Sequence, residues 1–344
     1  MRITIRDIAD RAGVSKTTVS FAFNDPRKIS KATHERIMAI ATELGYVPDP
    51  VARTLTTKRT GSIGLLLPQP MREALLNPYV AELLQGIGAA CHENDGSLLI
   101  VPPVKGRLVE AARRAAVDGL IAIGVGPDHS IVDLVRKRHI PLLIIDGSPE
   151  SATATVGIDD EAAAAELMRY VLGLGHRRVA VVELETESYN EPDERSSLVR
   201  DRRMRGFEKA LAEFGLDPRG PAVKVYSAPC SIRGGMDAFA RILAEGTPSA
   251  VVAMADIVAV GILSACRERG VEVPKELSVV SFDDIELARH LSPALTTVRQ
   301  PGFDKGYEAG RVLFGMLNER PAERLVMPFE LVVRASSAAR ASGA

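Results

Sequence analysis

Two adjacent carboxylates, Asp283 and Asp284, directly follow the apolar run LSVVSF in this chain of 344 residues. Such a pair could act as an acid and a base, or its oxygens could accept hydrogen bonds from a polar ligand. In α/β proteins, ligands bind beyond the carboxyl ends of parallel strands. The position directly after an apolar strand therefore favours ligand binding over catalysis.

The motifs of common enzymes and metal sites are missing from the sequence. It contains no GxGxxG, GxxxxGKS/T, GxSxG or HExxH motif, and its six histidines do not cluster at ligand spacing. We interpret His176, in GLGHRR, as a structural residue between a helix and a strand. Cys91, Cys230 and Cys266 lie far apart without a CxxC pair, which predicts buried thiols in a reducing cytosol rather than a disulfide or zinc site. We expect no metal and no cofactor.

Composition and charge indicate a globular protein with a basic amino-terminal module. Hydrophobic residues make up 46% of the chain and charged residues 25%, and the length predicts two or three domains. The start, MRITIRDIAD, has no apolar export signal, so we expect a cytoplasmic protein. Residues 1–59 hold 11 Lys and Arg against 6 Asp and Glu, whereas the remainder holds 32 against 38. This asymmetry is typical of polyanion binders, although many solvated faces carry a similar excess.

Three short helices are predicted within residues 1–47. Their expected caps and stops are Thr4 with Asp7, Gly13, Ser15, Ser30 and Gly45. Apolar residues recur at helical spacing in each helix, as in Val19, Ala22 and Phe23 of the second. Two short helices around a glycine-containing turn, braced by a third, form a helix-turn-helix unit, whose second helix enters the major groove.

The outward face of that second helix, in VSKTTVSFAFND, is unusual because it shows a phenylalanine to water. Thr17, Ser20, Phe21 and Asn24 lie opposite the apolar face. Phe21 could be a single exposed aromatic residue, which needs no explanation. Alternatively, Phe21 contacts a thymine methyl, Thr17 and Lys16 reach base edges, and Ser20 and Asn24 hold phosphates.

Residues 48–60 connect this module to the rest of the chain. Asp49 can cap a helix that begins at Pro50, but only about seven residues can be helical before Gly61. Isolated helices of this length are marginal in water. We therefore expect a linker that becomes helical when something stabilises it; the alternative is an ordinary basic tether.

From residue 61 to residue 344, short apolar runs alternate with helical patterns. The first series contains SIGLLLP, SLLIVPP, GLIAIGV and PLLIID, and the second RVAVVEL, VKVYS, AVVAMAD and LSVVSF. Such alternation predicts βαβ units and parallel sheets that are covered on both faces. Two similar series predict two doubly wound subdomains in an α/β protein.

Several ordered motifs together resemble the LacI/GalR family of transcription regulators. They are TIRDIADRAGVSKTTVSFAFND, ATELGYVPDPVARTLTTKRTGSIGLLLP, GLGHRRVAVV, RGFEKAL and LSVVSFDDIELARHLSPALTTVRQP. The resemblance implies a helix-turn-helix domain over 1–47, a hinge helix over 48–60 and a periplasmic-binding-protein-like body over 61–344. The expected lobes of the body are 61–163 with 296–322, and 164–295 with 323–338.

The resemblance also implies how the chain binds DNA. In the family, the hinge helix pairs with its dimer mate in the minor groove, where a leucine wedges between base pairs. The matching residue is Leu55, beside Ala52, and Lys58 and Arg59 lie just beyond it, suited to phosphates. We expect a repressor that binds a pseudo-palindromic operator as a homodimer.

A small-molecule effector between the lobes is the second implication of the resemblance. The matching residues are Tyr79, Asp146, Arg203, Asp283 and Gln300. Asp283 would accept a ligand hydroxyl and Arg203 would be the positive anchor, for a sugar, a sugar derivative or a nucleoside. Arg203 and Asp146 could instead form ion pairs that stabilise the lobes.

Three features depart from the family pattern. Ala255-Asp256 stands where many sugar-binding members have Asn-Asp, and Phe21 replaces a frequent arginine. The acidic and polar stretch Glu185–Ser197 predicts an enlarged loop near the cleft.

Two other functions are weighed against the regulator. A sugar-binding carrier is disfavoured by the amino-terminal module, and a cytosolic enzyme by the missing catalytic motifs.

Overall fold

The computed structural model describes residues 3–67, 71–104, 107–148, 153–185 and 197–340. The chain divides into two compact units, Met1–Gly61 and Ser62–Ala344, which we call the amino-terminal unit and the body. Among the described residues, no helix is both long and apolar enough to cross a membrane.

The amino-terminal unit is helical. Its helices are α1 (Ile5–Ala12), α2 (Lys16–Asn24), a 3-10 turn (Pro26–Lys28), α3 (Lys31–Glu43) and α4 (Pro50–Thr57). The Asp7 carboxylate accepts hydrogen bonds from the backbone N–H and the hydroxyl of Thr4, both at 2.8 Å. Ser15 and Ser30 cap α2 and α3, as the sequence predicts. The three helices pack around a small core at whose centre lie the fully buried Ile8, Val19 and Ile37.

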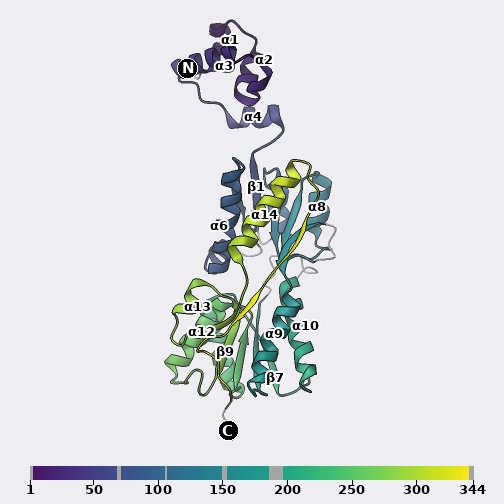
Figure 1. Cartoon of the computed structure of the whole chain (residues 1–344), viewed down its shortest axis with the longest axis vertical. Coiled ribbons are helices and arrows are strands. Elements are labelled where there is room, and N and C mark those ends of the chain that lie inside the picture. Colours follow the sequence, from purple (N-terminus) through teal and green to yellow (C-terminus); the bar gives the residue numbers. More distant parts are fainter. Residues whose placement is uncertain (1–2, 68–70, 105–106, 149–152, 186–196, 341–344) are drawn as a thin grey trace. The chain divides into compact units, whose positions relative to one another are not determined.

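The first lobe of the body, which contains the strand labelled β1 in Figure 1, is a six-stranded parallel sheet in the order β11-β5-β4-β3-β1-β2. Its strands are β1 (Ser62–Leu66), β2 (Ser97–Val101), β3 (Gly119–Ile123), β4 (Leu142–Ile145), β5 (Ala154–Ile158) and β11 (Arg324–Met327). Its helices are α5 (Met71–Ala74), α6 (Pro78–Glu93), α7 (Leu108–Arg114), α8 (Ser130–Arg138) and α14 (Gly302–Leu317). Apolar clusters lie on both faces of this sheet, one beneath α6 and α14 and one beneath α7 and α8.

The second lobe repeats the architecture with the order β12-β10-β9-β8-β6-β7, in which only β12 is antiparallel to its neighbour. Its strands are β6 (Val179–Leu184), β7 (Val223–Ala228), β8 (Ala250–Ala253), β9 (Ser278–Asp283), β10 (Thr296–Arg299) and β12 (Glu330–Val332). Its helices are α9 (Asp160–Gly173), α10 (Leu198–Glu213), α11 (Ile232–Glu245), α12 (Asp256–Glu268) and α13 (Glu286–His290). The predicted pair of doubly wound sheets is thus confirmed.

The structure moves the approximate lobe boundaries expected from the sequence by a few residues at three places. Residues 296–322 were expected in the first lobe, but β10 pairs with β9 in the second, so the chain crosses after β10. Residues 323–338 were expected in the second lobe, but β11 pairs with β5 in the first. The first crossing follows β5, because α9 already packs against α10 from residue 160 onward. Strands as short as β10 and β11, with four residues each, carry no periodic signal that tells which sheet they join.

Helix α14 lies unusually close to α6, and this closeness positions the site described below. A Cβ atom added at Gly86 of α6 would lie 2.0 Å from the carbonyl oxygen of Phe303, and one at Gly306 of α14 would lie 2.2 Å from that of Leu83. Only glycine allows this approach, because any larger residue would push the two helices apart.

Candidate DNA-binding surface and effector pocket

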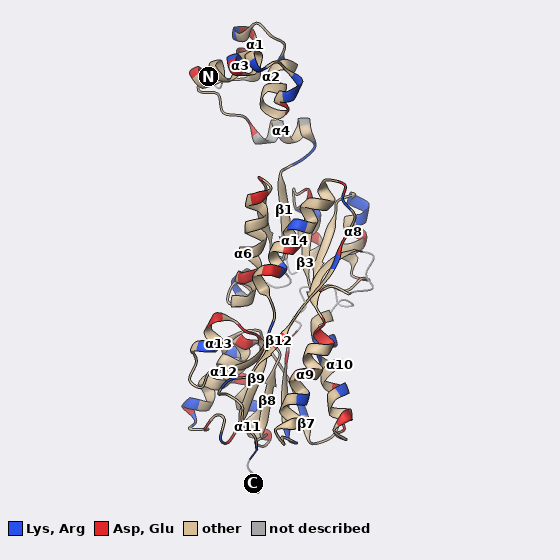
Figure 2. Cartoon of the chain, in the orientation of Figure 1, with Lys and Arg blue, Asp and Glu red and all other residues tan. Residues whose placement is uncertain are grey.

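Helix α2 turns the predicted polar face away from the core. Lys16, Thr17 and Asn24 are exposed, and Ser20 is half-buried and accepts a hydrogen bond from the Asn24 amide at 3.2 Å. Ser15 is exposed, but its hydroxyl accepts a hydrogen bond from the backbone N–H of Thr18, so it also caps the helix. Figure 2 colours the ribbon by charge, and both Lys and Arg and Asp and Glu occur in the amino-terminal unit and in the body.

Phe21 is half-buried, and a cation covers one face of its ring. Lys28 Nζ lies 5.0 Å from the ring centroid and 3.6 Å from a carboxylate oxygen of Asp25. A cation over an aromatic face is attracted by the ring quadrupole. Phe21 is therefore held in place while part of the ring faces water. The sequence pattern did not single out Lys28, because it lies outside the helix.

Helix α4 presents a large apolar side chain to water. Leu55 is 79% exposed, and Ala52 is exposed on the same short helix. Lys58, just beyond the helix, is exposed and adopts a left-handed conformation with φ of 57°. A helix of eight residues has too few internal hydrogen bonds to persist alone, so an exposed leucine on it is suited to contact with another molecule.

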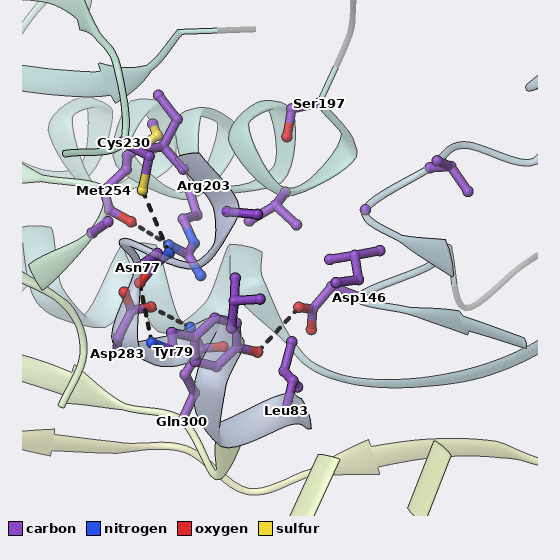
Figure 3. A pocket seen from close by; sticks show the side chains of 18 of the residues that line it. Asn77, Tyr79, Leu83, Asp146, Ser197, Arg203, Cys230, Met254, Asp283 and Gln300 are labelled. Carbon is purple, nitrogen blue, oxygen red and sulfur yellow. Dashed lines mark hydrogen bonds between the residues drawn. The ribbon is translucent and has the colours of Figure 1, made fainter. Parts of the chain in front are cut away.

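A cavity of about 180 Å³ lies between the two lobes of the body, and all five predicted effector residues line it (Figure 3). Tyr79 and Asp146 come from the first lobe, and Arg203 and Asp283 from the second. Gln300 lies in the crossing between β10 and α14. The structure thus brings together residues that lie far apart in the sequence.

Arg203 is fixed on the second-lobe wall by three contacts. Its Nε donates to Asp160 Oδ1 at 2.9 Å, its Nη1 donates to the Met254 carbonyl at 2.5 Å, and its guanidinium lies 4.1 Å from the ring centroid of Phe282. Both Arg203 and Asp160 are buried. The ion pair that the sequence left as an alternative for Arg203 therefore exists, although Arg203 also lines the cavity. Asp160 was not predicted from the sequence.

Asp283 lines the cavity and has one carboxylate oxygen with a hydrogen-bond partner and one without. Its Oδ1 accepts a hydrogen bond from Gln300 Nε2 at 2.5 Å, whereas its Oδ2 is buried with no hydrogen-bond partner in the described part of the chain. Burial raises the pKa of this carboxyl to about 6, and the nearby Arg203 only partly offsets that effect. A buried carboxylate oxygen without a partner is costly, so a ligand hydroxyl or amine that donates to it would be bound favourably.

The first-lobe wall contains a fully buried lysine that sequence analysis missed. Lys305 Nζ donates to Asp146 Oδ1 at 2.6 Å, to Gln300 Oε1 at 2.6 Å and to the Tyr79 hydroxyl at 3.1 Å. An ammonium has three donors, so these contacts saturate it. Burial raises the pKa of Tyr79 well above its usual value, and its protonated hydroxyl donates to Asp146 Oδ2 at 3.4 Å.

The carboxylates that flank the pocket have structural partners instead. Asp284 pairs with Arg299 at 2.7 Å and Arg334 at 2.6 Å, so the adjacent acids of the sequence have separate roles. Asp256 accepts hydrogen bonds from the Thr297 hydroxyl at 2.6 Å and the Ile285 backbone N–H at 3.0 Å, while Ala255 lines the cavity.

Several remaining sequence predictions can also be located. One ring nitrogen of the buried His176, Nε2, lies 3.1 Å from the Ala338 carbonyl, which agrees with a structural role. The three cysteines are free thiols; Cys91 and Cys266 are buried as predicted, but Cys230 is only half-buried, and the described residues contain no cluster of His, Cys, Asp and Glu suited to a metal. Residues 186–196 of the expected enlarged loop lie outside the described residues, but Glu185 and Ser197 on either side line the cavity.

Three further contacts join the lobes around the cavity. Asn77, which caps α6, donates from its amide to Cys230 Sγ at 3.5 Å. On the other side, the backbone N–H of Leu198 donates to the Gly124 carbonyl at 3.3 Å, and the Arg202 guanidinium donates to the Gly147 carbonyl. The cavity is therefore bounded by contacts that opening of the lobes would break.

Both parts of the chain match known protein families. Residues 4–49 match the family described as bacterial regulatory proteins, lacI family, and residues 168–337 match the periplasmic binding protein-like domain. The chain is 34% identical over 330 residues to the HTH-type transcriptional regulator Rv3575c of Mycobacterium tuberculosis, covering 91% of this chain and 90% of that protein. It is 32% identical over 346 residues to the HTH-type transcriptional repressor PurR of Photobacterium profundum, covering 97% and 98%.

Solved structures agree with this assignment. The transcriptional regulator CelR in complex with cellobiose is 25% identical, with a TM-score of 0.69 over 97% of this chain and 100% of that one. The lac repressor dimer bound to operator and the anti-inducer ONPF has the same fold, with a TM-score of 0.80 at 24% identity over 98% and 100%. The chain belongs to the LacI family. It is a transcriptional regulator with a helix-turn-helix DNA-binding domain and a ligand-binding domain, and its named relatives are regulators rather than enzymes.

Proposed function

We propose that the chain is a repressor that binds a pseudo-palindromic operator as a homodimer and changes its DNA affinity when a small ligand enters the cavity. The observation that carries this proposal is a cavity lined by both lobes, with Asp283 in its lining and one carboxylate oxygen of that residue without a hydrogen-bond partner in the described part of the chain. A ligand that donates to this oxygen binds one lobe arrangement better than another, and such differential affinity is what allosteric control requires.

On the DNA side, α2 is the element proposed to enter the major groove. Phe21 would contact a thymine methyl, Thr17 and Lys16 would reach base edges, and Ser20 and Asn24 would hold phosphates with Ser15 at the start of the helix. Leu55 would wedge between base pairs in the minor groove beside Ala52, with Lys58 on a phosphate. Inverted half-sites would match the two-fold symmetry of a dimer.

The charges around the cavity favour an uncharged ligand. Two cations, Arg203 and Lys305, lie in or beside the lining together with four carboxylates, which leaves two net negative charges when all are ionised; the carboxylates are Asp146, Asp160, Glu185 and Asp283. A phosphorylated ligand would be repelled, whereas a neutral polyol, sugar or nucleoside could donate hydroxyls to Asp283. The cellobiose bound by the similar regulator CelR supports a sugar.

A salt-dependent gel-shift assay tests this function. Operators are first selected from random duplex DNA with the full chain, and the expected result is an inverted repeat bound by a dimer with affinity that falls steeply with salt. Neutral sugars and nucleosides are then added beside their phosphorylated forms, and only neutral members should change the shift. Failure to bind any selected duplex would favour the alternative of a sugar-binding carrier.

Two substitutions connect the ligand effect to the proposed site. The variants Arg203→Ala and Asp283→Ala should bind operator nearly as the wild type does and lose the response to any neutral ligand found above. A normal response in both variants would place the effector elsewhere.

A further inference from the structure

A continuous line of buried hydrogen bonds connects the two lobes through the cavity wall. It runs from Asp146 at the end of β4 to Lys305 of α14, then to Gln300 in the crossing, and ends at Asp283 of β9. The three steps measure 2.6, 2.6 and 2.5 Å. Figure 3 shows the end of this line, where the Gln300 and Asp283 side chains meet below Arg203. The first lobe is thus hydrogen-bonded to the second through one lysine.

The lysine helps to fix the orientation of the Gln300 amide. An ammonium only donates hydrogen bonds, so the amide oxygen Oε1 must face Lys305. The amide nitrogen Nε2 then faces Asp283 and holds its Oδ1. The other carboxylate oxygen, Oδ2, has no hydrogen-bond partner in the described part of the chain. The Asp283 carboxylate accepts from Nε2 and favours the same orientation, so Lys305 and Asp283 hold the amide from its two ends.

Stability alone does not account for the lysine. Lys305 and Asp146 are 0% and 3% exposed, so both charges lose their hydration on folding. Replacing a buried ion pair by uncharged groups of similar volume is often neutral or stabilising. The surrounding helices would accept an apolar residue, since Lys305 lies at helical spacing from the buried Ala309 and Val312.

We propose that Lys305 is a positioning residue of the effector pocket, which orients Gln300 and through it Asp283, and which ties the first lobe to the second. This inference deepens the proposed ligand control, and it rests on that proposal for its biological meaning only. Loss of the lysine should loosen the closed arrangement of the lobes even when no ligand or DNA is added.

Cys230 supplies a direct reporter of that arrangement. Its thiol lines the cavity and accepts the hydrogen bond from Asn77 across the lobes. Burial raises its pKa to about 12, which suppresses the reactive thiolate. Cys230 is half-buried, and opening of the lobes would break the bond from Asn77, expose the thiol further and lessen this suppression. The other thiols, Cys91 and Cys266, are buried within single lobes and serve as internal references.

The experiment compares the rate at which 5,5′-dithiobis(2-nitrobenzoic acid) modifies each cysteine of the full chain, resolved by peptide mass mapping. The test variant is Lys305→Met with Asp146→Asn, which removes both charges together and leaves neither one unpaired. We expect Cys230 to react about tenfold faster than in the wild type, a factor that corresponds to about 1.4 kcal/mol. The rates of Cys91 and Cys266 should stay unchanged.

The matched control is Arg311→Met with Glu323→Gln, which removes an ion pair within the first lobe between the same helix, α14, and the residue before β11. It should leave the Cys230 rate at the wild-type value. A folded test variant with a wild-type Cys230 rate would overturn the proposal, as would equal acceleration in the control.

A second variant covers the case in which the double substitution prevents folding. Gln300→Met breaks the line while Lys305 keeps its bonds to Asp146 and Tyr79, and it should give the same acceleration of Cys230. An unchanged rate in this variant would also overturn the proposal. Because the assay contains neither operator nor effector, its result is independent of whether the repressor function itself is confirmed.

Discussion

In the amino-terminal unit, the side chains proposed to bind DNA lie on the surfaces of helices. Leu55 is 79% exposed, and Lys16 and Thr17 are exposed to water. In the body, the corresponding groups lie inside: Arg203 is 3% exposed and Lys305 is 0% exposed. Duplex DNA binds to the outer surface of a protein, whereas a small ligand is recognised in a cavity that encloses it. Substitutions in the first region should therefore change binding with little loss of stability, and those in the second should change stability as well.

The largest effect is expected from Arg203→Met in the body. The substitution leaves the Asp160 carboxylate fully buried, with Arg202 at 3.9 Å as its nearest remaining cation. Removing one partner of a buried ion pair costs about 3–5 kcal/mol, which urea denaturation would measure. The double variant with Asp160→Asn should recover much of that loss. A single variant as stable as the wild type would show that burial of this pair has little energetic weight.

Leu55→Ala should affect DNA binding and leave stability alone. We expect a loss of a few kcal/mol on operator, the scale of unstacking a base step, and a much smaller loss on random DNA, where phosphate contacts dominate. The thermal unfolding of the chain should not change. Leu287→Ala, which removes a leucine 41% exposed in the body, is the control that should alter neither affinity. Equal losses on both DNAs would contradict the wedge.

Asp283→Asn should stabilise the body in a pH-dependent way. Burial raises the pKa of Asp283 from 3.8 to about 6. The folded state therefore holds this proton more tightly than the unfolded state does, which adds to the free energy of unfolding at low pH. That contribution is lost as the pH rises through 6. At pH 8 the amide should gain up to about 3 kcal/mol over the wild type, and the gain should vanish toward pH 4.

Its neighbour provides the control for that experiment. Asp284→Asn breaks ion pairs with Arg299 and Arg334 and should destabilise the body at pH 8. Denaturation curves at pH 5, 6, 7 and 8 compare the two variants. A gain for Asp283→Asn that stays constant across this range would argue against a raised pKa.

The smallest effect concerns sequence preference. Phe21 should select a T·A pair in each half-site through the thymine methyl, and Phe21→Arg should prefer guanine at that position by about 1–3 kcal/mol. Selection of sites from random DNA with both proteins measures the change. An unchanged preference would make Phe21 a packing residue beneath Lys28, in agreement with the 5.0 Å contact between them.

The sequence predicted those parts of the structure that depend on local order. Caps such as Ser15 and the strand-end carboxylates Asp146 and Asp283 were found because an apolar run or a helix signal marks each position. The two sheets followed from the alternation of such runs. Local signals also identified α2 and its polar face.

Lys305 was missed, and the lobe boundaries were off by a few residues, because both depend on packing between distant segments. Asp304 and Glu308 surround the lysine in the sequence, so it looks like part of a charged surface. Lys305 is buried because α14 packs closely against α6, a helix whose residues lie more than 200 positions earlier in the sequence. The sequence did contain one signal of this burial, because Lys305 lies at helical spacing from the apolar residues Ala309 and Val312.

The crossings between the lobes also determine the order in which parts of the protein can fold during synthesis. Helix α14 and strand β11 belong to the first lobe, but the ribosome makes them after nearly all of the second. The first lobe, which contains Lys305, therefore stays incomplete until late, and pairing between such distant segments is slow. The three-helix packing of the amino-terminal unit, by contrast, is local and forms early. On a growing chain, the helices that read DNA are thus ready well before the pocket that would control them.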